Sequence, residues 1–415
     1  MNIGIVTTWF ERGGAYVSRQ YRDILKRKHN VYIYARGGKT YAINDPLWDD
    51  KYVEWEKRGS SFRYPLDINL KNFKNWIVNN HLDTVFFNEQ HWWAPVLLCN
   101  KLGIKVGSYV DYYTEDTIPF FLSYDFLICN TQHHYSVFNW HPQVFYVPWG
   151  TDLKTFSPKS YKLVSPDTVT FFHSCGFNPK RKGTDIVLQA FAKLSDIFSG
   201  SARLVIHSQV SITEFFPQMR KLIKTLENRG LLTCHEKNVS APGLYHLGDV
   251  YLYPSRLDGI GLTISEALAC GLPVITSDNP PMKEFINGSN GKLIKVSRLY
   301  YRADGYYWPQ CMVDVDDLFK CMRSYIENMA GIREYKRAAR MYAETNLDWS
   351  KNAKSCVVLF EKSSKRPIKE KLHIMKQIEE YDQKALSWKT LLYLRFPHIY
   401  TMLKLIQRYY KYVSH

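Results

Sequence analysis

One stretch of the sequence combines two carboxylates, two glycines and a helix start at spacings that suit anion binding. Asp258 precedes a turn that contains Gly259 and Gly261, and Glu266 follows eight positions after Asp258 in a helix expected at 263–270. Glycines let the backbone approach a ligand closely, and a helix start offers N–H groups and a positive dipole end to an anion. The two carboxylates can accept hydrogen bonds from sugar hydroxyls. The stretch therefore predicts a site for a phosphorylated ligand.

Alternating strands and helices must position that stretch. Apolar strand-like runs recur around it, with enough residues between them for crossover helices, at 168–174, 202–208, 249–253, 272–276 and 291–296. A helix expected at 184–194 carries its apolar residues on one face. This pattern favours a doubly wound parallel sheet, in which ligands bind at the carboxyl ends of the strands.

A second series of the same kind comes earlier in the chain. Its strands are expected at 2–7, 31–35, 84–87, 105–109, 126–129 and 143–147, and a helix is expected at 15–28. A polar stretch with two prolines, 157–167, is interpreted as a linker. The sequence therefore predicts an α/β protein with two Rossmann-like doubly wound domains, 1–156 and 168–362, that face each other across a cleft, and a basic helical tail, 363–415.

The composition excludes several classes of protein. The chain has 415 residues, too many for one small core, and its 45% hydrophobic and 23% charged residues exclude disorder over most of its length. The eight cysteines are spread singly without a C-x-x-C pair, so we interpret them as reduced thiols. Neither a secretory signal nor an apolar run of about 18 residues is visible, so we expect a cytoplasmic protein that contacts membranes only from their surface.

Positive charge gathers at the C-terminal end. From Lys362 onward the chain has 12 Lys and Arg against 4 Asp and Glu. The resulting excess of +8 is half of the net charge of +16. One helical face there is apolar, formed by Ile399, Met402, Leu403, Ile406 and Tyr410. Two interpretations stay open: a basic amphipathic helix on an anionic membrane, or a terminal helix that folds back over the first domain.

The stretch from Asp258 onward resembles the nucleotide-sugar signature of family 4 glycosyltransferases, which are retaining enzymes of the GT-B fold. That signature has two Glu separated by seven residues; here the first is Asp258, shorter by one methylene, and the second is Glu266. The resemblance implies that Asp258 touches the donor sugar and that Glu266 holds the nucleotide ribose. It also places the diphosphate on the backbone of Gly259, Ile260, Gly261, Leu262 and Thr263.

The segment 176–183 resembles the phosphate-binding loop of the same family. Lys182 stands in the Lys-Gly pair of that loop. The family usually has Arg directly after the first glycine, where this chain has Phe177. The second cation must therefore come from Lys180 or Arg181, or be missing.

Further landmarks of the family follow the same order along the chain. Gly13 and Gly14 resemble its first glycine-rich loop, and we assign them to ligand binding. The segment 147–156 resembles its domain-linking stretch, and Glu284 with Gly291 resembles the end of its signature. The resemblance covers residues 1 to about 361.

A loop after the strand expected at 105–109 departs from the family, which commonly carries a His there near the reaction centre. Asp111 falls nearest to that place, either to orient the sugar or acceptor or to stabilise a turn. His91, His133 and His134 are further candidates for acceptor contacts, although a single His is more often a hydrogen-bonded structural residue.

The chemistry that the resemblance implies needs no metal. Cleavage of a sugar–phosphate bond builds negative charge on the leaving nucleoside diphosphate, which backbone N–H donors and Lys182 can stabilise. Asp314 and Asp316 have the spacing of a metal-binding pair, but they directly precede an expected helix and are interpreted as its start.

We therefore expect a glycosyltransferase that moves a hexose-type sugar, with neither cofactor nor metal, in polysaccharide or glycolipid synthesis. Residues 168–362 would bind the nucleotide-diphosphate sugar, and residues 1–156 the glycan or lipid-linked acceptor. An anionic membrane surface is the partner considered for the tail, and no nucleic acid is expected. Alternatives are an epimerase or hydrolase of the same fold, or a basic nucleic-acid or membrane-binding module. A dehydrogenase is disfavoured because the first strand does not lead into G-x-G-x-x-G.

Overall fold

The computed structural model describes residues 1–36, 41–56, 68–385, 402 and 406. The chain divides into two compact units. Unit 1 comprises Met1–Val147, Tyr301–Trp308 and Ala353–His415, and unit 2 comprises Pro148–Tyr300 and Pro309–Asn352. Each unit is built on its own parallel sheet, which confirms the prediction of two Rossmann-like α/β domains.

The described residues of unit 1 form a seven-stranded sheet of order β3-β2-β1-β4-β5-β6-β7, in which all neighbours pair in parallel. The strands are β1 (Asn2–Thr7), β2 (Asn30–Ala35), β3 (Val53–Trp55), β4 (Thr84–Phe87), β5 (Lys105–Tyr109), β6 (Phe126–Cys129) and β7 (Val144–Tyr146). The helices are α1 (Gly13–Leu25), α2 (Leu70–Asn79), α3 (Ala94–Lys101), the 3-10 helix η1 (Glu115–Ser123), α4 (Gln132–Phe138), α13 (Lys354–Lys362) and α14 (Ile368–Ala385).

Unit 2 contains a six-stranded parallel sheet of order β10-β9-β8-β11-β12-β13. Its strands are β8 (Val169–Gly176), β9 (Ala202–Ser208), β10 (Leu232–Glu236), β11 (Val250–Tyr253), β12 (Val274–Ser277) and β13 (Gly291–Ile294). The longer helices are α6 (Thr184–Ile197), α8 (Arg220–Asn228), α9 (Leu262–Ala269), α10 (Val315–Glu327) and α11 (Ile332–Asn346). The short ones are α5 (Pro179–Lys182), α7 (Ile212–Phe215), η2 (Pro217–Met219), η3 (Tyr245–Leu247), η4 (Met282–Phe285), η5 (Met329–Gly331) and α12 (Trp349–Asn352).

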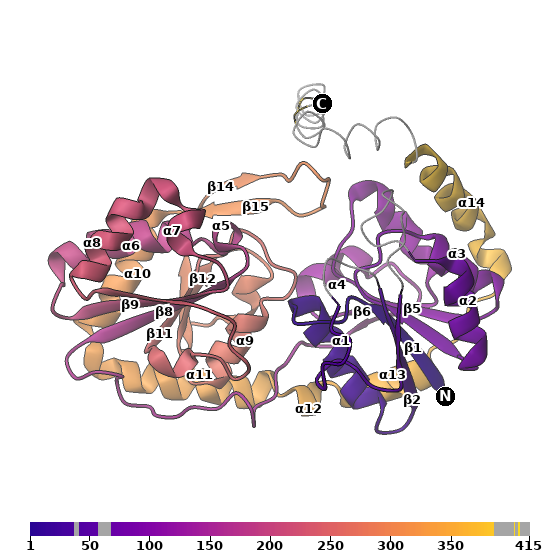
Figure 1. Cartoon of the computed structure of the whole chain (residues 1–415), viewed down its shortest axis with the longest axis horizontal. Helices are drawn as coiled ribbons and strands as arrows, with labels where there is room; N and C mark the ends of the chain where they lie inside the picture. Colours follow the sequence, from indigo (N-terminus) through magenta and orange to yellow (C-terminus); the bar gives the residue numbers. More distant parts are fainter. Residues whose placement is uncertain (37–40, 57–67, 386–401, 403–405, 407–415) are drawn as a thin grey trace. The chain divides into compact units, whose positions relative to one another are not determined.

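Helices cover both faces of the sheets, as Figure 1 shows for unit 2, where α6 and α10 lie on one face and α9 and α11 on the other. The central strands are therefore buried on both faces: every residue of β4, β6, β11 and β12 is buried. Parallel strands covered in this way need continuous apolar runs, which is why the sequence showed them plainly.

The strands that sequence patterning missed lack such runs. β3 is short and none of its residues is buried, and β10 alternates polar with apolar residues at the edge of its sheet. The strand expected at 291–296 is two strands, because β13 ends at Ile294 and β14 (Val296–Tyr300) pairs antiparallel with β15 (Gln310–Val313). This hairpin has no counterpart in the predicted series.

The division of the chain differs from the predicted ranges in four places. Residues 148–156, predicted in the first domain, lie in unit 2. Residues 157–167, interpreted as a linker, lie within unit 2. Tyr301–Trp308, which connect β14 and β15, belong to unit 1, although both strands belong to unit 2. Residues 353–362, which were placed in the second domain, also belong to unit 1 because α13 packs on α1.

The first part of the basic tail is a structural element of unit 1. Lys371 Nζ lies 2.7 Å from Asp125 Oδ1, and both side chains are almost fully buried. The apolar face of α14, with Ile374, Met375 and Ile378, joins the core of the unit. Folding back, one of the two interpretations of the tail, therefore holds for α14.

The expected amphipathic face near the C-terminus lies outside the described residues, except for Met402 and Ile406. Both of these side chains are exposed. Among the helices that the structure describes, none has the length and apolar character needed to cross a bilayer.

Candidate active site

The predicted phosphate site lies where β11 leads into α9 in unit 2. Gly261 directly precedes α9 with a φ of +90°, in the left-handed region that favours glycine, and no side chain caps the helix. Nothing lies within 4 Å of the position that a Cβ would take on Gly259. The first turn of α9, which contains Leu262 and Thr263, therefore begins beside open space, with Ile260 buried beneath it.

Lys182 reaches this loop because of the glycine that follows it. Gly183 has a φ of +77°, and a Cβ on it would lie 2.2 Å from the carbonyl oxygen of Pro254. The backbone of the phosphate-binding loop thus packs directly against the end of β11. Lys182 Nζ donates a hydrogen bond to Asp258 Oδ2 and one to the hydroxyl of Tyr253.

Asp258 is held by three donors. Its Oδ2 accepts from Lys182 and from the hydroxyl of Tyr253, and its Oδ1 accepts from the Gly259 N–H at 2.9 Å. Burial alone would raise the pKa of this carboxyl, but the charges of Lys182 and Arg181 and the hydrogen bonds hold the pKa well below its usual range. Burial lowers the pKa of Lys182, and Asp258 opposes that shift.

Glu266 lies one turn further along α9, in contact with Tyr245 of η3. The Tyr245 hydroxyl donates to Glu266 Oε2 at 2.6 Å. Burial raises the pKa of Glu266 to about 7, although this hydrogen bond and the charge of Lys182 act in the opposite direction. A carboxylate in this position can accept a hydrogen bond from a ligand hydroxyl and titrates near neutral pH.

The structure separates the two candidates for the second cation. Lys180 Nζ lies 2.8 Å from Asp185 Oδ2, and Asp185 also binds the buried guanidinium of Arg256. Arg181, in contrast, acts on Asp258 and lowers its pKa. Phe177 is 61% exposed at the start of the same loop. Arg181 therefore stays the candidate for the cation that accompanies Lys182.

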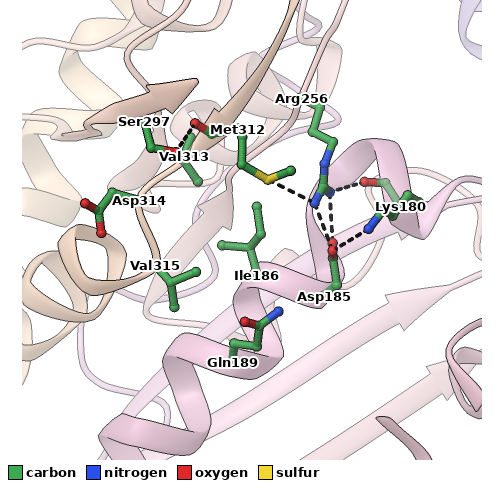
Figure 2. Close-up of a pocket in the computed structure, with 10 residues that line it drawn as sticks. All are labelled: Lys180, Asp185, Ile186, Gln189, Arg256, Ser297, Met312, Val313, Asp314 and Val315. Atoms are coloured by element: carbon green, nitrogen blue, oxygen red, sulfur yellow. Dashed lines mark hydrogen bonds and ion pairs between the residues drawn. The ribbon is translucent and has the colours of Figure 1, made fainter. Parts of the chain in front are cut away.

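A pocket of about 440 Å³ lies beside this loop in unit 2 (Figure 2). Lys180, Asp185 and Arg256 line one side of it, and Figure 2 shows their hydrogen bonds to one another. Met312 and Asp314 line the other side. Neither Lys182 nor Glu266 borders the pocket, so it is separate from the predicted phosphate site.

In unit 1, polar side chains gather where β1, β2, β4 and β5 end. Arg36 is 2% exposed and donates to the carbonyl oxygens of Glu89 and Asn88, at 2.6 and 2.7 Å. The carboxylate of Glu89 lies within about 3 Å of the position that a Cβ on Gly14 would take, at the start of α1, which Gly13 opens. Gly14 therefore leaves room for an internal carboxylate.

Asp111, the candidate in the departing loop, lies near this group. Burial and the charge of Glu89 raise its pKa, and Arg36 opposes the shift. The hydroxyl of Tyr306, from the segment between β14 and β15, donates to the Asp111 carbonyl oxygen at 3.1 Å. The ring of Tyr112 stacks between Tyr306 and the exposed His91, with ring centroids 5.2 and 4.2 Å apart.

The other two histidines make internal contacts. His134 is fully buried and its Nδ1 lies 2.9 Å from the Tyr113 hydroxyl. His133 stacks on Trp308 with ring centroids 3.5 Å apart. Of the three histidines considered for acceptor contacts, His91 is the exposed one.

The predicted site residues fall into two groups, one in each unit. Unit 2 brings together Lys182, Arg181, Asp258 and Glu266 with the start of α9, while Gly13, Gly14 and Asp111 lie in unit 1. Sequence reasoning missed Tyr253 and Tyr245, which bind the two acids, and Glu89. Tyr253 is the last residue of the apolar strand β11, and Glu89 lies two residues after the apolar strand β4. Positions at these strand ends could have identified both residues, whereas Tyr245 offers no such signal.

Asp314 and Asp316, which have the spacing of a metal-binding pair, lie at the start of α10. The Asp314 side chain accepts hydrogen bonds from the N–H groups of Asp316 and Asp317, which confirms that it begins α10. Among the described residues, no group of three or more His, Cys, Asp or Glu is arranged to hold a metal ion.

Comparison with known proteins identifies the kind of domain that unit 2 contains. Residues 168–300 match the family model described as Glycosyl transferases group 1. An O-antigen biosynthesis glycosyltransferase of Escherichia coli, WclY, is 33% identical over 29% of this chain and 32% of its own length. A GDP-mannose-dependent phosphatidylinositol dimannoside mannosyltransferase of Mycobacterium tuberculosis is 24% identical over 54% of this chain and 58% of its own. The chain spans less than two thirds of the length of these curated relatives.

Solved structures resemble the whole architecture. A glycosyltransferase of Rickettsia africae has a TM-score of 0.67 and 16% identity, over 88% of this chain and 99% of that one. HepE of Anabaena, solved in complex with UDP and glucose, has a TM-score of 0.63 and 13% identity, over 87% and 99%. These structures confirm the predicted GT-B fold, and the match of residues 168–300 to the family model supports the resemblance to glycosyltransferases.

Proposed function

We propose, from the premise that residues 168–300 form a glycosyl transferase group 1 domain within a GT-B fold, that this chain is a glycosyltransferase. It moves a hexose-type sugar from a nucleoside diphosphate donor to a glycan or lipid-linked acceptor in polysaccharide or glycolipid synthesis, with retention of configuration. The observation that carries the proposal is the placement of Lys182 against Asp258 at the open start of α9.

The donor diphosphate is proposed to lie on the backbone that leads into α9. Gly259 leaves open space there, and the first N–H groups of α9 have no side-chain cap. Lys182 and Arg181 supply two positive charges beside that backbone. Glu266 is available for the ribose hydroxyls because its partner Tyr245 occupies Oε2 alone. HepE, whose structure holds UDP and glucose, supports a donor of this chemical class.

This arrangement favours departure of a nucleoside diphosphate. Negative charge grows on the diphosphate as the sugar–phosphate bond breaks, and fixed cations and N–H donors stabilise that charge most strongly in the transition state. Loss of one such donor costs about 3 kcal/mol, or about a hundredfold in rate. These groups supply the required stabilisation from the protein itself, so the proposal includes no metal.

The acceptor is proposed to bind unit 1 at the loops after β4 and β5. Glu89 and Asp111 are partly accessible there and can accept hydrogen bonds from sugar hydroxyls, and His91 exposes its ring. Arg36 and Tyr306 fix the backbone of these loops by their hydrogen bonds. A flat ring beside carboxylates suits the apolar face and the hydroxyl edge of a sugar.

Thermal unfolding with a panel of sugar nucleotides tests the donor assignment. UDP-, GDP- and ADP-sugars are added to the full chain, and one base class should raise the melting temperature, since a ligand that binds the folded state stabilises it by mass action. Lys182→Ala should remove the rise. Lys193→Ala, which breaks an exposed ion pair with Asp316 elsewhere in unit 2, should keep it. A panel without any rise in the wild-type protein contradicts the proposal.

Product analysis then tests the reaction. The stabilising donor is incubated with neutral methyl glycosides, and mass spectrometry should detect a glycoside enlarged by one sugar. NMR of its anomeric proton reports whether configuration is retained. A free sugar or an isomerised donor as the sole product would instead indicate a hydrolase or an epimerase.

A further inference from the structure

Asp258 stands where family 4 glycosyltransferases have the acid that touches the donor sugar. In this chain, however, both oxygens of its carboxylate already accept hydrogen bonds. Lys182 and Tyr253 donate to Oδ2, and the Gly259 N–H donates to Oδ1. A carboxylate offers about four acceptor positions, so three of them are taken within unit 2. Lys182 and Tyr253 fill Oδ2, so a donor sugar could reach Asp258 only at the one position left on Oδ1.

The partners of Asp258 are themselves fixed. Tyr253 is fully buried at the end of β11, and its carbonyl oxygen accepts from the Thr276 hydroxyl of β12 at 2.8 Å. The ring of Tyr253 also lies under the Lys182 ammonium, 4.6 Å from the ring centroid. The side chains of Lys182 and Asp258 are each 14% exposed. The three side chains form one hydrogen-bonded group.

The side chain at position 258 is short, and it ends among these partners. Asp is one methylene shorter than the Glu of the family pattern, and its carboxylate ends against Lys182 and its own following N–H. A lysine in such a buried position tends to lose its proton, because burial penalises the charged form. A neutral amine would not stabilise a leaving diphosphate, and the neighbouring carboxylate counteracts that loss.

We propose that Asp258 is a positioning residue, which holds Lys182 protonated and aimed at the diphosphate, and that it does not bind the donor sugar. The inference rests on the proposed function for its ligand, whereas the pairing itself is made by residues of this chain. Tyr253 shares the task because its hydroxyl joins Lys182 to Asp258. Recognition of the sugar then falls to other groups.

Binding of matched ligand pairs distinguishes the two roles. Calorimetry on the full chain compares UDP with UDP-glucose, GDP with GDP-mannose and ADP with ADP-glucose, for wild type and Asp258→Asn. If Asp258 acts through Lys182, the affinity for the diphosphate and for its sugar nucleotide falls by the same factor, about tenfold or more. A loss confined to the sugar nucleotide would overturn the proposal.

A double-mutant cycle shows whether Asp258 affects diphosphate affinity through Lys182 or through the fold in general. In the Lys182→Met background, Asp258→Asn should change the diphosphate affinity by less than about twofold, because the group through which it acts is gone. An undiminished effect in that background would contradict the proposal. Tyr253→Phe keeps the buried ring and removes only the hydroxyl, so it serves as a second variant and should weaken both members of a pair equally.

A donor-free measurement separates this inference from the proposed function. The pH titration of the Lys182 ¹⁵Nζ resonance, assigned with Lys182→Arg, should show a lower pKa in Asp258→Asn than in wild type. An unchanged titration would overturn the inference whatever ligand the protein binds. If none of the six nucleotides binds wild type, the proposed function fails, while this titration still decides whether Asp258 sustains the charge of Lys182.

Discussion

Replacement of Gly183 by Ala should disrupt the site from a position that contacts no ligand group. Gly183 joins α5 to α6 with a φ of +77°, and an added Cβ would lie 2.2 Å from the Pro254 carbonyl oxygen and 3.0 Å from its carbonyl carbon. Backbone atoms cannot rotate aside as a side chain could. The two segments that carry Lys182 and Asp258 must therefore move apart.

The loss of stability expected for Gly183→Ala is the sum of two separable costs. A non-glycine residue in the left-handed region costs about 1–2 kcal/mol, and overpacking against fixed backbone adds about 1–3 kcal/mol. Gly230 provides a matched control, because it lies in the same unit with a φ of +67° and nothing within 4 Å of a Cβ. Gly230→Ala should therefore show the first cost alone.

Thermal unfolding and donor binding measure the two effects. For a unit of this size, about 1 kcal/mol corresponds to a fall of about 2–4 °C in melting temperature. Gly183→Ala should lower the melting temperature of unit 2 by clearly more than Gly230→Ala and should also weaken sugar-nucleotide binding, which Gly230→Ala leaves unchanged. Equal falls for both variants with intact donor binding would refute the reasoning.

Two further predictions concern buried charges. Lys371→Met leaves Asp125 buried without its cation, so it should lower the free energy of unfolding of unit 1 by about 3–5 kcal/mol in urea unfolding. The control Lys101→Met breaks an exposed ion pair and should cost at most about 1 kcal/mol. Similar costs for the two variants would argue that α14 is not part of the core. Because burial raises the pKa of Glu266 to about 7, protonation on going from pH 8 to pH 6 removes its acceptor, and sugar-nucleotide affinity should fall about tenfold. Glu266→Gln should flatten that profile, and a pH-independent wild type would exclude the assigned role.

The buried strands and the α9 stretch were predictable because their physics is local. β1, β4, β5, β6 and β9 have the predicted bounds. In β1, β4 and β6 the reason is that strands covered on both faces require apolar runs. The turn before α9 needs glycine for its backbone, and that requirement is readable in the chain itself. Edge strands such as β10, which alternate polar and apolar residues, left no comparable signal.

The amino-acid sequence by itself determined the two α/β units, the glycine turn before α9 and the residue types that surround it. Only the tertiary structure decided the partners of those residues. Asp258 is bound by Lys182 and Tyr253, Lys180 is paired with Asp185, and Tyr306 supports the Asp111 loop. Most of these contacts join segments far apart in the chain. Periodicity and motif spacing report a residue's neighbours along the chain, whereas hydrogen bonds and pKa shifts arise from neighbours in space.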